Sequence, residues 1–312
     1  MNDRVSVVVL TYNDFSLLPR CLSSIFSQDY CNIEIIIQDD GSVNFNKDYI
    51  ETLFYDKGNN IKSILINHNE KNLGTVKNYN KAVQCATGEY VLPLSCDDMF
   101  YDTDVISHTV QFFLDTNCNV CTGYVIGEIS HNTYPTKKEI ELLLPENKKK
   151  CMERLFASNF ICGAALYWRT KYLQKIGGFD EEFMLVEDYP MVLRLIQHNE
   201  QIYFMPVKMI IHGEDGVSTR WNTLMKKNML AHNDAKHIKD KYVMPYLNNV
   251  ENQRVKRYIQ ACYFLKFAKN KKQFVVKFLK YADVWLSVVL YFIWKKIKKC
   301  PEVSYYEYRF ER

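Results

Sequence analysis

Three pairs of adjacent acidic residues are the clearest candidates for chemistry in this chain of 312 residues. They are Asp39-Asp40, Asp97-Asp98 and Glu187-Asp188. Neighbouring carboxylates repel each other unless a cation or hydrogen-bond donors offset their charge, and hard divalent cations bind one or two carboxylates together with substrate phosphates. The alternatives are a solvated turn for the aspartate pairs and a helix start for Glu187-Asp188, where acids complement the helix dipole. The pairs alone leave both interpretations open.

Alternating strands and helices are predicted for the first hundred residues. Short apolar runs rich in β-branched residues predict strands at 5–10, 33–37, 61–66 and 90–94. Helical spacing of apolar residues predicts a helix over 17–26, with Ser16 as N-cap and Pro19 in the first turn, and another over 75–86. This alternation indicates a mostly parallel sheet covered on both faces.

Ligands of such sheets bind at the carboxyl ends of the strands, so the residues directly after each strand are candidates for a site. They are Thr11-Tyr12-Asn13 and the segments 39–42, 67–74 and 95–98. The first of these has no glycine where a dinucleotide-binding unit has GxGxxG, which argues against NAD, FAD and a nicotinamide oxidoreductase. No GxxxxGK[ST] loop occurs either, which disfavours a P-loop nucleotidase.

Five short motifs follow one another along the first two thirds of the chain. They are VSVVVLTYN at 5–13, DDGS at 39–42, NLG at 72–74 with Lys77-Asn78, GEYVLPLSCDD at 88–98 and GGFDEEFMLVED at 177–188. In this order and spacing the chain resembles the family 2 glycosyltransferases over residues 3–215. The resemblance implies an α/β fold of the GT-A type, with a mixed, mostly parallel sheet flanked by helices and, here, a C-terminal helical basic extension.

The resemblance also implies a nucleotide-sugar site at the ends of the first strands. Thr11, Tyr12 and Asp40 match positions that hold the uridine or a related base. Tyr12 would pack on the base and Asp40 would accept from its ring N–H. Asn13 and Asn72 lie in the same motifs and are assigned to the same donor site.

Phosphate, ribose and metal contacts are implied by the later motifs. Lys77 stands where the family often has an arginine, and a lysine keeps the charge but loses the bidentate fork. Asp97 matches the carboxylate that meets the ribose, and Asp98 matches the ligand of Mn²⁺ or Mg²⁺. Ser95 replaces a further aspartate common in the family, so metal ligation rests mainly on Asp98. His212 resembles a late histidine near the metal or diphosphate.

Asp188 matches the catalytic base of the family. Inverting transfer needs a carboxylate that takes the proton from the acceptor hydroxyl while a metal stabilises the departing diphosphate. The segment 213–220 contains two glycines and is expected to close over the donor, with Arg220 within reach of a phosphate.

Charge is distributed unevenly along the chain. The net charge is +4, yet the stretch 254–299 holds 13 basic residues and one acid, a net +12, which leaves −8 for the rest. Such asymmetry indicates an anionic partner. The stretch is also rich in aromatic residues, and Phe274, Phe278, Ala282 and Trp285 would share one helical face. Its longest apolar run, 284–294, is too short to span a bilayer, so the tail is expected to lie on an anionic membrane surface.

The alternative for the tail is a helical hairpin packed on the catalytic domain. Nucleic acid is disfavoured as a partner, because no recognisable reader motif accompanies the basic face. No leader follows Met1, so the expected location is cytoplasmic, peripheral on the inner face of the cell membrane. Ten cysteines without a dense framework fit that setting, and the lone CxxC of Cys118 and Cys121 is expected to serve packing.

Together these observations predict three regions: a nucleotide-sugar-binding half at 1–101, an acceptor-binding half with the base at 102–216, and a helical membrane-association region at 217–312. The predicted activity is metal-dependent inverting transfer, of hexosyltransferase type, from a nucleotide-diphosphate sugar, a UDP-sugar, to a lipid-linked or growing glycan in capsule or other surface polysaccharide synthesis. The alternative is a catalytically inactive nucleotide-sugar-binding or partner-docking subunit.

Overall fold

The computed structural model describes residues 3–213 and 229–298, and its chain divides into two compact units. The first unit comprises residues 1–148 and 160–235, and the second comprises 149–159 and 236–312. The first unit contains all five motifs of the sequence, and the second contains the basic, aromatic tail.

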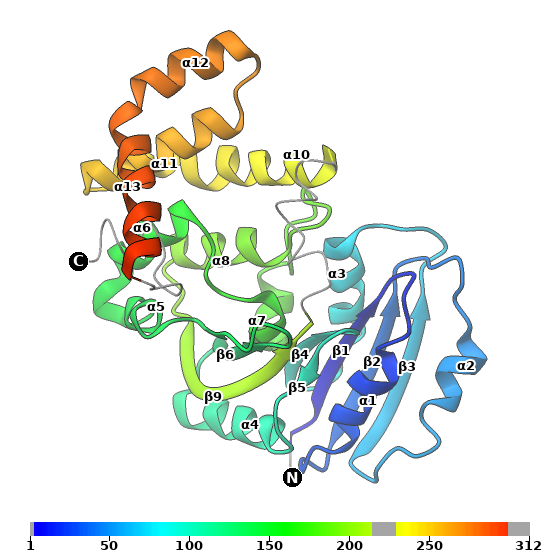
Figure 1. Ribbon diagram of the computed structural model, residues 1–312. Coiled ribbons are helices and arrows are strands. Elements are labelled where there is room, and N and C mark those ends of the chain that lie inside the picture. The colour runs from blue at the N-terminus through cyan, green and yellow to red at the C-terminus, as the bar shows by residue number, and fades with distance from the viewer. Residues whose placement is uncertain (1–2, 214–228, 299–312) are drawn as a thin grey trace. The chain divides into compact units, whose positions relative to one another are not determined.

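One mixed sheet of nine strands forms the centre of the first unit (Figure 1). In sheet order the strands are β3 (Ile61–His68), β2 (Ile33–Asp39), β1 (Val5–Thr11), β4 (Tyr90–Ser95), β8 (Tyr167–Arg169), β6 (Val120–Gly127), β9 (Tyr203–His212) and β5 (Met99–Phe100), with β7 (Thr133–Tyr134) paired to β6. The first four strands are parallel, whereas β8, β5 and β7 pair antiparallel to their neighbours. This architecture confirms the predicted α/β fold with a mostly parallel sheet.

The four predicted strands are confirmed, and each extends one or two residues further than its apolar run. β1 ends at Thr11 and β2 at Asp39, and these two residues pair in register. β4 likewise continues to Ser95, which pairs with Leu10. The backbone of the candidate site therefore begins inside the hydrogen-bonded sheet, which fixes where each following turn starts.

Helices cover both faces of the sheet, as predicted. Along β1, Val5, Val7 and Val9 share a hydrophobic cluster with α1 (Leu18–Phe26) and α4 (Val105–Thr116). Val8 is fully buried outside that cluster, because alternate residues of a strand point to opposite faces. On that second face α3 (Thr75–Cys85) packs against β1 and β2.

The start of α1 differs from the sequence prediction. Pro19 lies in the first turn as expected, but the helix begins at Leu18 and Leu17 occupies the N-cap position, so the assignment of Ser16 as N-cap was wrong. Ser16 instead donates its hydroxyl to Asp14 Oδ1 at 2.7 Å, and its amide binds the same oxygen at 2.9 Å. This local turn uses the serine side chain before the helix starts.

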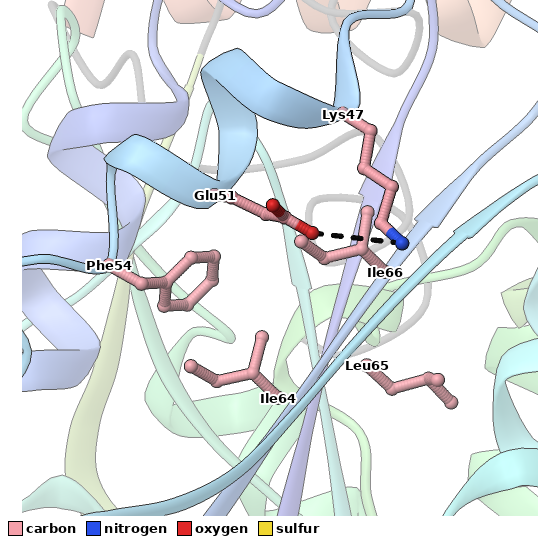
Figure 2. A pocket seen from close by; sticks show the side chains of 6 residues that line it. All are labelled: Lys47, Glu51, Phe54, Ile64, Leu65 and Ile66. Carbon is pink, nitrogen blue, oxygen red and sulfur yellow. Dashed lines mark ion pairs between the residues drawn. The ribbon is translucent and has the colours of Figure 1, made fainter.

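The remaining helices of the first unit lie around the sheet or lead to it. They are α2 (Lys47–Thr52), α5 (Lys137–Leu142), α7 (Thr170–Lys175), α8 (Asp188–Gln197) and the first part of α10 (Met229–Ile238). A short 3₁₀ turn, Gly163–Ala165, precedes β8. A cavity of about 340 Å³ lies between α2 and the outer strand β3, lined by Lys47, Glu51, Phe54, Ile64, Leu65 and Ile66 (Figure 2).

The second unit is helical. It contains α11 (Gln253–Lys266), α12 (Lys271–Lys280) and α13 (Ala282–Lys298), together with most of α6 (Lys148–Ala157). Glu153 of α6 accepts from the amides of Glu251 and Asn252, just before α11, at 3.1 and 3.2 Å. A small core of Ala261, Tyr281 and Val284 joins the last three helices.

The predicted single aromatic face of the tail is divided between two helices, because α12 ends at Lys280 and α13 begins at Ala282. The rings nevertheless form a continuous stack, with Phe278 at 6.2 Å from Phe274 and 6.4 Å from Trp285 between centroids. Along the described residues, no helix combines the length and the apolar character that crossing a membrane requires.

Candidate active site

Asp40 is buried at the end of β2 and binds the segment that precedes α3. Its Oδ1 accepts from the amide of Leu73 at 2.8 Å and from Asn69 Nδ2 at 3.1 Å, and its Oδ2 accepts from the amide of Gly74 at 2.9 Å. A carboxylate offers about four acceptor positions, so these three bonds leave room for one further donor. Asn72 shapes the same turn, since its Oδ1 also accepts from Gly74 at 3.0 Å.

Asp39, the other member of the pair, is fully buried and organises the ends of three strands. It accepts from the hydroxyl of Thr11 at 3.0 Å, from both the amide and the hydroxyl of Ser42, and from His68 Nδ1 at 2.7 Å. Thr11 is thus turned inward, whereas Tyr12 is 49% exposed and available to pack against a ligand.

Two further residues of the predicted donor site lie on its rim. Asn13 adopts a left-handed conformation, with a φ of 59°, and its amide donates to Ser42 Oγ at 2.7 Å. Lys77 is exposed in the first turn of α3, next to the buried Asn78, which binds the backbone of Gln38. The structure therefore gathers the ends of β1 and β2 and the turn before α3 into one polar edge.

Asp98 is fully buried in the turn after β4 and contacts the end of β9. Its Oδ1 accepts from His212 Nδ1 at 2.7 Å and from the amide of Gly213 at 2.9 Å. The pairing of Met99 with Ile211 brings these two segments together. The two residues that the sequence assigned to a metal are thus hydrogen-bonded neighbours, although 114 residues separate them in the chain.

The second oxygen of Asp98, Oδ2, is buried and has no hydrogen-bond partner among the described residues. A buried carboxylate oxygen left in this state costs free energy unless a cation or donor meets it. Within the same residues no cluster of three or more His, Cys, Asp or Glu side chains is arranged to hold a metal ion. Asp98 therefore fits an ion that takes most of its other ligands from a substrate.

Asp97 lies beside this carboxylate and is partly buried. Burial raises the pKa of Asp97, and the negative charge of Asp98 raises it further. Arg20 of α1 donates to the backbone carbonyl of Asp97 at 2.9 Å and forms an ion pair with Glu128 after β6. Gly213 packs so closely that a Cβ atom there would lie 2.8 Å from the same carbonyl.

Glu187 and Asp188 begin α8, as the sequence predicted. Burial raises the pKa of Glu187 to about 8, and the adjacent charge of Asp188 raises it too. At neutral pH Glu187 therefore carries its proton most of the time, which removes one of two neighbouring negative charges. Asp188 Oδ1 accepts from the amide of Tyr189 at 2.6 Å.

The charges of both acidic groups act on the segment Cys162-Gly163. Burial raises the pKa of the Cys162 thiol, and the charges of both Asp98 and Asp188 raise it further, so this residue lies near both carboxylates. A Cβ atom on Gly163 would stand 2.9 Å from Asp188 Cβ and 2.9 Å from Glu187 Oε1. Asp188 thus packs against this turn, and the charge of Asp98, 90 positions away in sequence, also reaches it.

Three of these features were not predicted from the sequence: the bond between His68 and Asp39, the contact of Arg20 with Asp97, and the approach of Cys162-Gly163. His68 ends a strand at the predicted binding edge, which is the one local signal it carries. Cys118 and Cys121 are both buried and neither forms a disulfide. Arg220 and the segment 214–220 lie outside the described residues.

Comparison with known proteins agrees with this arrangement. The family model described as Glycosyl transferase family 2 matches residues 6–176, more than half of the chain. A colanic acid biosynthesis glycosyl transferase of Escherichia coli K12, WcaA, is 28% identical over 253 residues, which cover 77% of this chain and 83% of that protein.

Two solved structures share the fold. The mannosyltransferase PcManGT from Pyrobaculum calidifontis, in complex with GDP-Man and Mn²⁺, matches with a TM-score of 0.62 at 14% identity, over 96% of this chain and 83% of that one. S. aureus TarS 1–349, in complex with UDP-GlcNAc, matches with a TM-score of 0.60 at 18% identity, over 89% and 80%.

The sheet order, the flanking helices and the C-terminal helices define a GT-A-type glycosyltransferase fold. The chain belongs to glycosyl transferase family 2, and the protein is a glycosyltransferase.

Replacing Glu187 with glutamine should alter how stability depends on pH. Because folding raises the pKa of Glu187 from 4.5 to about 8, the stability that its protonated form contributes is complete below the unfolded value and is lost as pH rises through about 8. Glutamine imitates the protonated acid at every pH. The Tm of Glu187→Gln relative to the wild type should therefore rise between about pH 5 and about pH 9, by about 2–4 °C for each kcal/mol relieved.

Differential scanning fluorimetry across this pH range measures the effect. Glu146→Gln, at an exposed position, is the matched control and should show a constant difference. An equally constant difference for Glu187→Gln would contradict the assignment of the raised pKa.

Proposed function

We propose that this protein is an inverting, hexosyl-transferring enzyme that moves a sugar from a UDP-sugar to a lipid-linked or growing glycan in the synthesis of a surface polysaccharide. The observation that carries the proposal is the approach of Asp98 and Asp188 to the same turn, Cys162-Gly163. One carboxylate is thereby close to the expected diphosphate and the other to the expected acceptor. The similarity to WcaA, whose name connects it with colanic acid biosynthesis, supports a role in the synthesis of a surface polysaccharide.

Asp188 acts as the general base in this scheme. As the acceptor oxygen bonds to the anomeric carbon, the bond from that carbon to the diphosphate breaks and its electron pair leaves with the diphosphate. The proton of the acceptor hydroxyl passes to the Asp188 carboxylate, and the configuration at the anomeric carbon inverts. The protonated state of Glu187 at neutral pH supports this role, because it spares Asp188 a second adjacent charge.

The donor is held by residues of the polar edge. Tyr12 packs on the base, Asp40 accepts from its ring N–H through the remaining acceptor position, and Asp97 meets the ribose. Asn13 and Asn72 fix the turns on either side, and Lys77 lies toward the phosphates. All of these side chains except Asp40 are exposed or partly exposed. Asp40 is buried but has one acceptor position left.

Asp98 is the residue that would hold Mn²⁺ or Mg²⁺, with His212 fixing the orientation of its carboxylate. The support is the buried Oδ2 that lacks a partner and the bond from His212 to the other oxygen. Such an ion, when bound, neutralises the charge that develops on the leaving diphosphate.

Asp188→Asn should abolish transfer while leaving the donor bound. The amide cannot accept the proton, so the rate of donor-dependent nucleoside diphosphate release should fall about 10²- to 10⁴-fold. Asp115→Asn changes an exposed carboxylate on α4 that accepts from Gln111 Nε2 at 2.7 Å, and it should retain the wild-type rate. Full activity of Asp188→Asn would remove Asp188 as the base.

Adding EDTA to the same assay tests the metal and the alternative of a binding-only protein. We expect EDTA to stop nucleoside diphosphate release and Mn²⁺ or Mg²⁺ to restore it. A chain that released none with any donor would be a binding module, and release unaffected by EDTA would exclude a metal-dependent reaction.

A uridine donor should stabilise the protein more than a guanosine donor. Binding to the folded state stabilises it by RT ln(1 + [L]/Kd), so a panel of UDP-, GDP- and dTDP-sugars at one concentration with Mn²⁺ can be ranked by thermal shift. Asp40→Asn should reduce the shift given by the best donor. A larger shift with a GDP-sugar would overturn the uridine assignment.

The helical second unit is proposed to attach the enzyme to an anionic membrane surface, on the cytoplasmic face of the cell membrane. In α12 and α13, apolar side chains that are half-exposed or more include Val276, Leu279, Leu286, Leu290, Ile293 and Ile297. Lys295, Lys296 and Lys298 lie in the last turns of α13. Exposed apolar side chains beside lysines are typical of helices that lie in the headgroup region.

Neutralising those three lysines should weaken vesicle binding. Because each lysine near an anionic surface contributes about 1 kcal/mol, the triple glutamine variant should bind phosphatidylglycerol vesicles about 100-fold more weakly. Lys47→Gln, on α2, is the control. Cosedimentation at low and moderate salt measures binding, and equal binding of the triple variant and the wild type would refute the membrane surface.

A further inference from the structure

The segment that carries Asp188 is fixed at its start by α3. Asn80 accepts from the amide of Phe179 at 2.8 Å and donates to its carbonyl at 2.9 Å. Gly178 lies so close that a Cβ atom there would stand 2.5 Å from Asn80 Oδ1. Tyr79 stacks on the ring of Phe179 with centroids 4.4 Å apart. These contacts end at Phe179, nine residues before Asp188, so they do not fix the residues that lead into α8.

A second anchor comes from Asp234 of α10, which is 7% exposed. Its carboxylate accepts from two consecutive amides, that of Met184 at 3.0 Å and that of Leu185 at 2.7 Å, both through Oδ2. Its Oδ1 lies 3.3 Å from the amide of Met184. Two successive amides that converge on one carboxylate form an anion-binding concavity, and Asp234 fills it.

The carbonyl group of Met184 contacts residues next to the predicted donor site. Its carbonyl accepts from the amide of Val76 at 3.4 Å, and Gly74 approaches so closely that a Cβ atom there would lie 2.5 Å from the same carbonyl. Gly74 is also the residue whose amide binds Asp40. A chain of direct contacts therefore runs from Asp40 through Gly74 and Met184 to Asp234.

We propose that Asp234 is a positioning residue for the reaction: by holding Met184 and Leu185, it fixes the segment that presents Asp188 to the acceptor. The inference rests on the proposed function of Asp188 as base. Leu185 is three residues from Asp188, so a shift of this backbone moves the start of α8. A displacement of about 1 Å in a catalytic group can reduce a rate by about 10²-fold.

Asparagine at this position keeps one oxygen but loses the negative charge that strengthens both bonds to Oδ2, and its NH₂ group cannot accept the longer contact from the Met184 amide. Asp234→Asn should therefore loosen residues 184–185 without emptying the donor site. We expect kcat to fall about 10- to 100-fold, with the donor Kd within about twofold of the wild type. Asp234→Glu keeps both oxygens and should recover part of the lost kcat.

Hydrogen exchange tests the contact independently of activity. In Asp234→Asn, peptides covering 179–190 should exchange faster, while peptides from α4 should not. Asp240→Asn is the matched control, since Asp240 lies six residues further along and binds the side chains of Lys236 and Tyr263 instead of a backbone. It should leave both exchange and kcat unchanged.

The proposal would be overturned by an unchanged kcat in Asp234→Asn, whatever the exchange, or by a fall in kcat matched by an equal loss of donor affinity. A lowered Tm that Asp234→Glu does not restore, with exchange faster throughout the unit, would likewise show a structural role only. Failure of the proposed function is distinguishable, because the wild-type chain would then release no nucleoside diphosphate from any donor.

Discussion

Buried aspartates that accept from backbone amides of distant segments hold this site together. Asp40 binds the amides of Leu73 and Gly74, Asp98 binds the amide of Gly213, and Asp234 binds those of Met184 and Leu185. A buried carboxylate is costly unless donors meet it, so each of these segments is drawn to one place. The sheet supplies fixed strand ends, and the carboxylates then determine where the following turns lie.

This mode of neutralisation also leaves the site electrostatically suited to a cation. Within residues 3–213 and 229–298, neither Asp40 nor Asp98 pairs with a lysine or arginine, and Arg20 binds the carbonyl of Asp97 instead of its carboxylate. Backbone amides and a histidine, instead of lysine or arginine side chains, meet the carboxylate oxygens. The residues outside 254–299 carry a net charge of −8, and part of it therefore lies at this edge of the sheet, where a metal and a diphosphate are expected.

The sequence predicted the strands, the helices and many residues at the binding edge of the sheet, because the patterns that indicate them are local. Apolar runs indicated the four strands, and the residues directly after them, such as Asp40 and Asp98, lie where parallel strands place them. Resemblance to a family added His212, whose contact with Asp98 follows from strand pairing that no local pattern contains.

The remaining contacts depend on which distant segments meet, and single residues give no signal for that. In the sequence Asp234 looks like any other charged residue on a helix. Its partners are backbone amides, which nearly every residue has. Arg20 has the same ambiguity on α1. In the tail, helical spacing continued through Tyr281, whereas the structure ends one helix there and packs the tyrosine into a small core. Tertiary packing outweighed local periodicity at that point.

We propose that Asp98 and a bound nucleotide together form a cation site. This is tested most directly by titrating Mn²⁺ into the protein with and without UDP, using calorimetry or the electron paramagnetic resonance signal of free Mn²⁺. Because the described residues supply one carboxylate oxygen and no three-ligand cluster, binding should be weak alone, tighten with UDP, and be lost in Asp98→Asn. Equal Mn²⁺ affinity in Asp98→Asn and the wild type, with UDP present, would contradict the account.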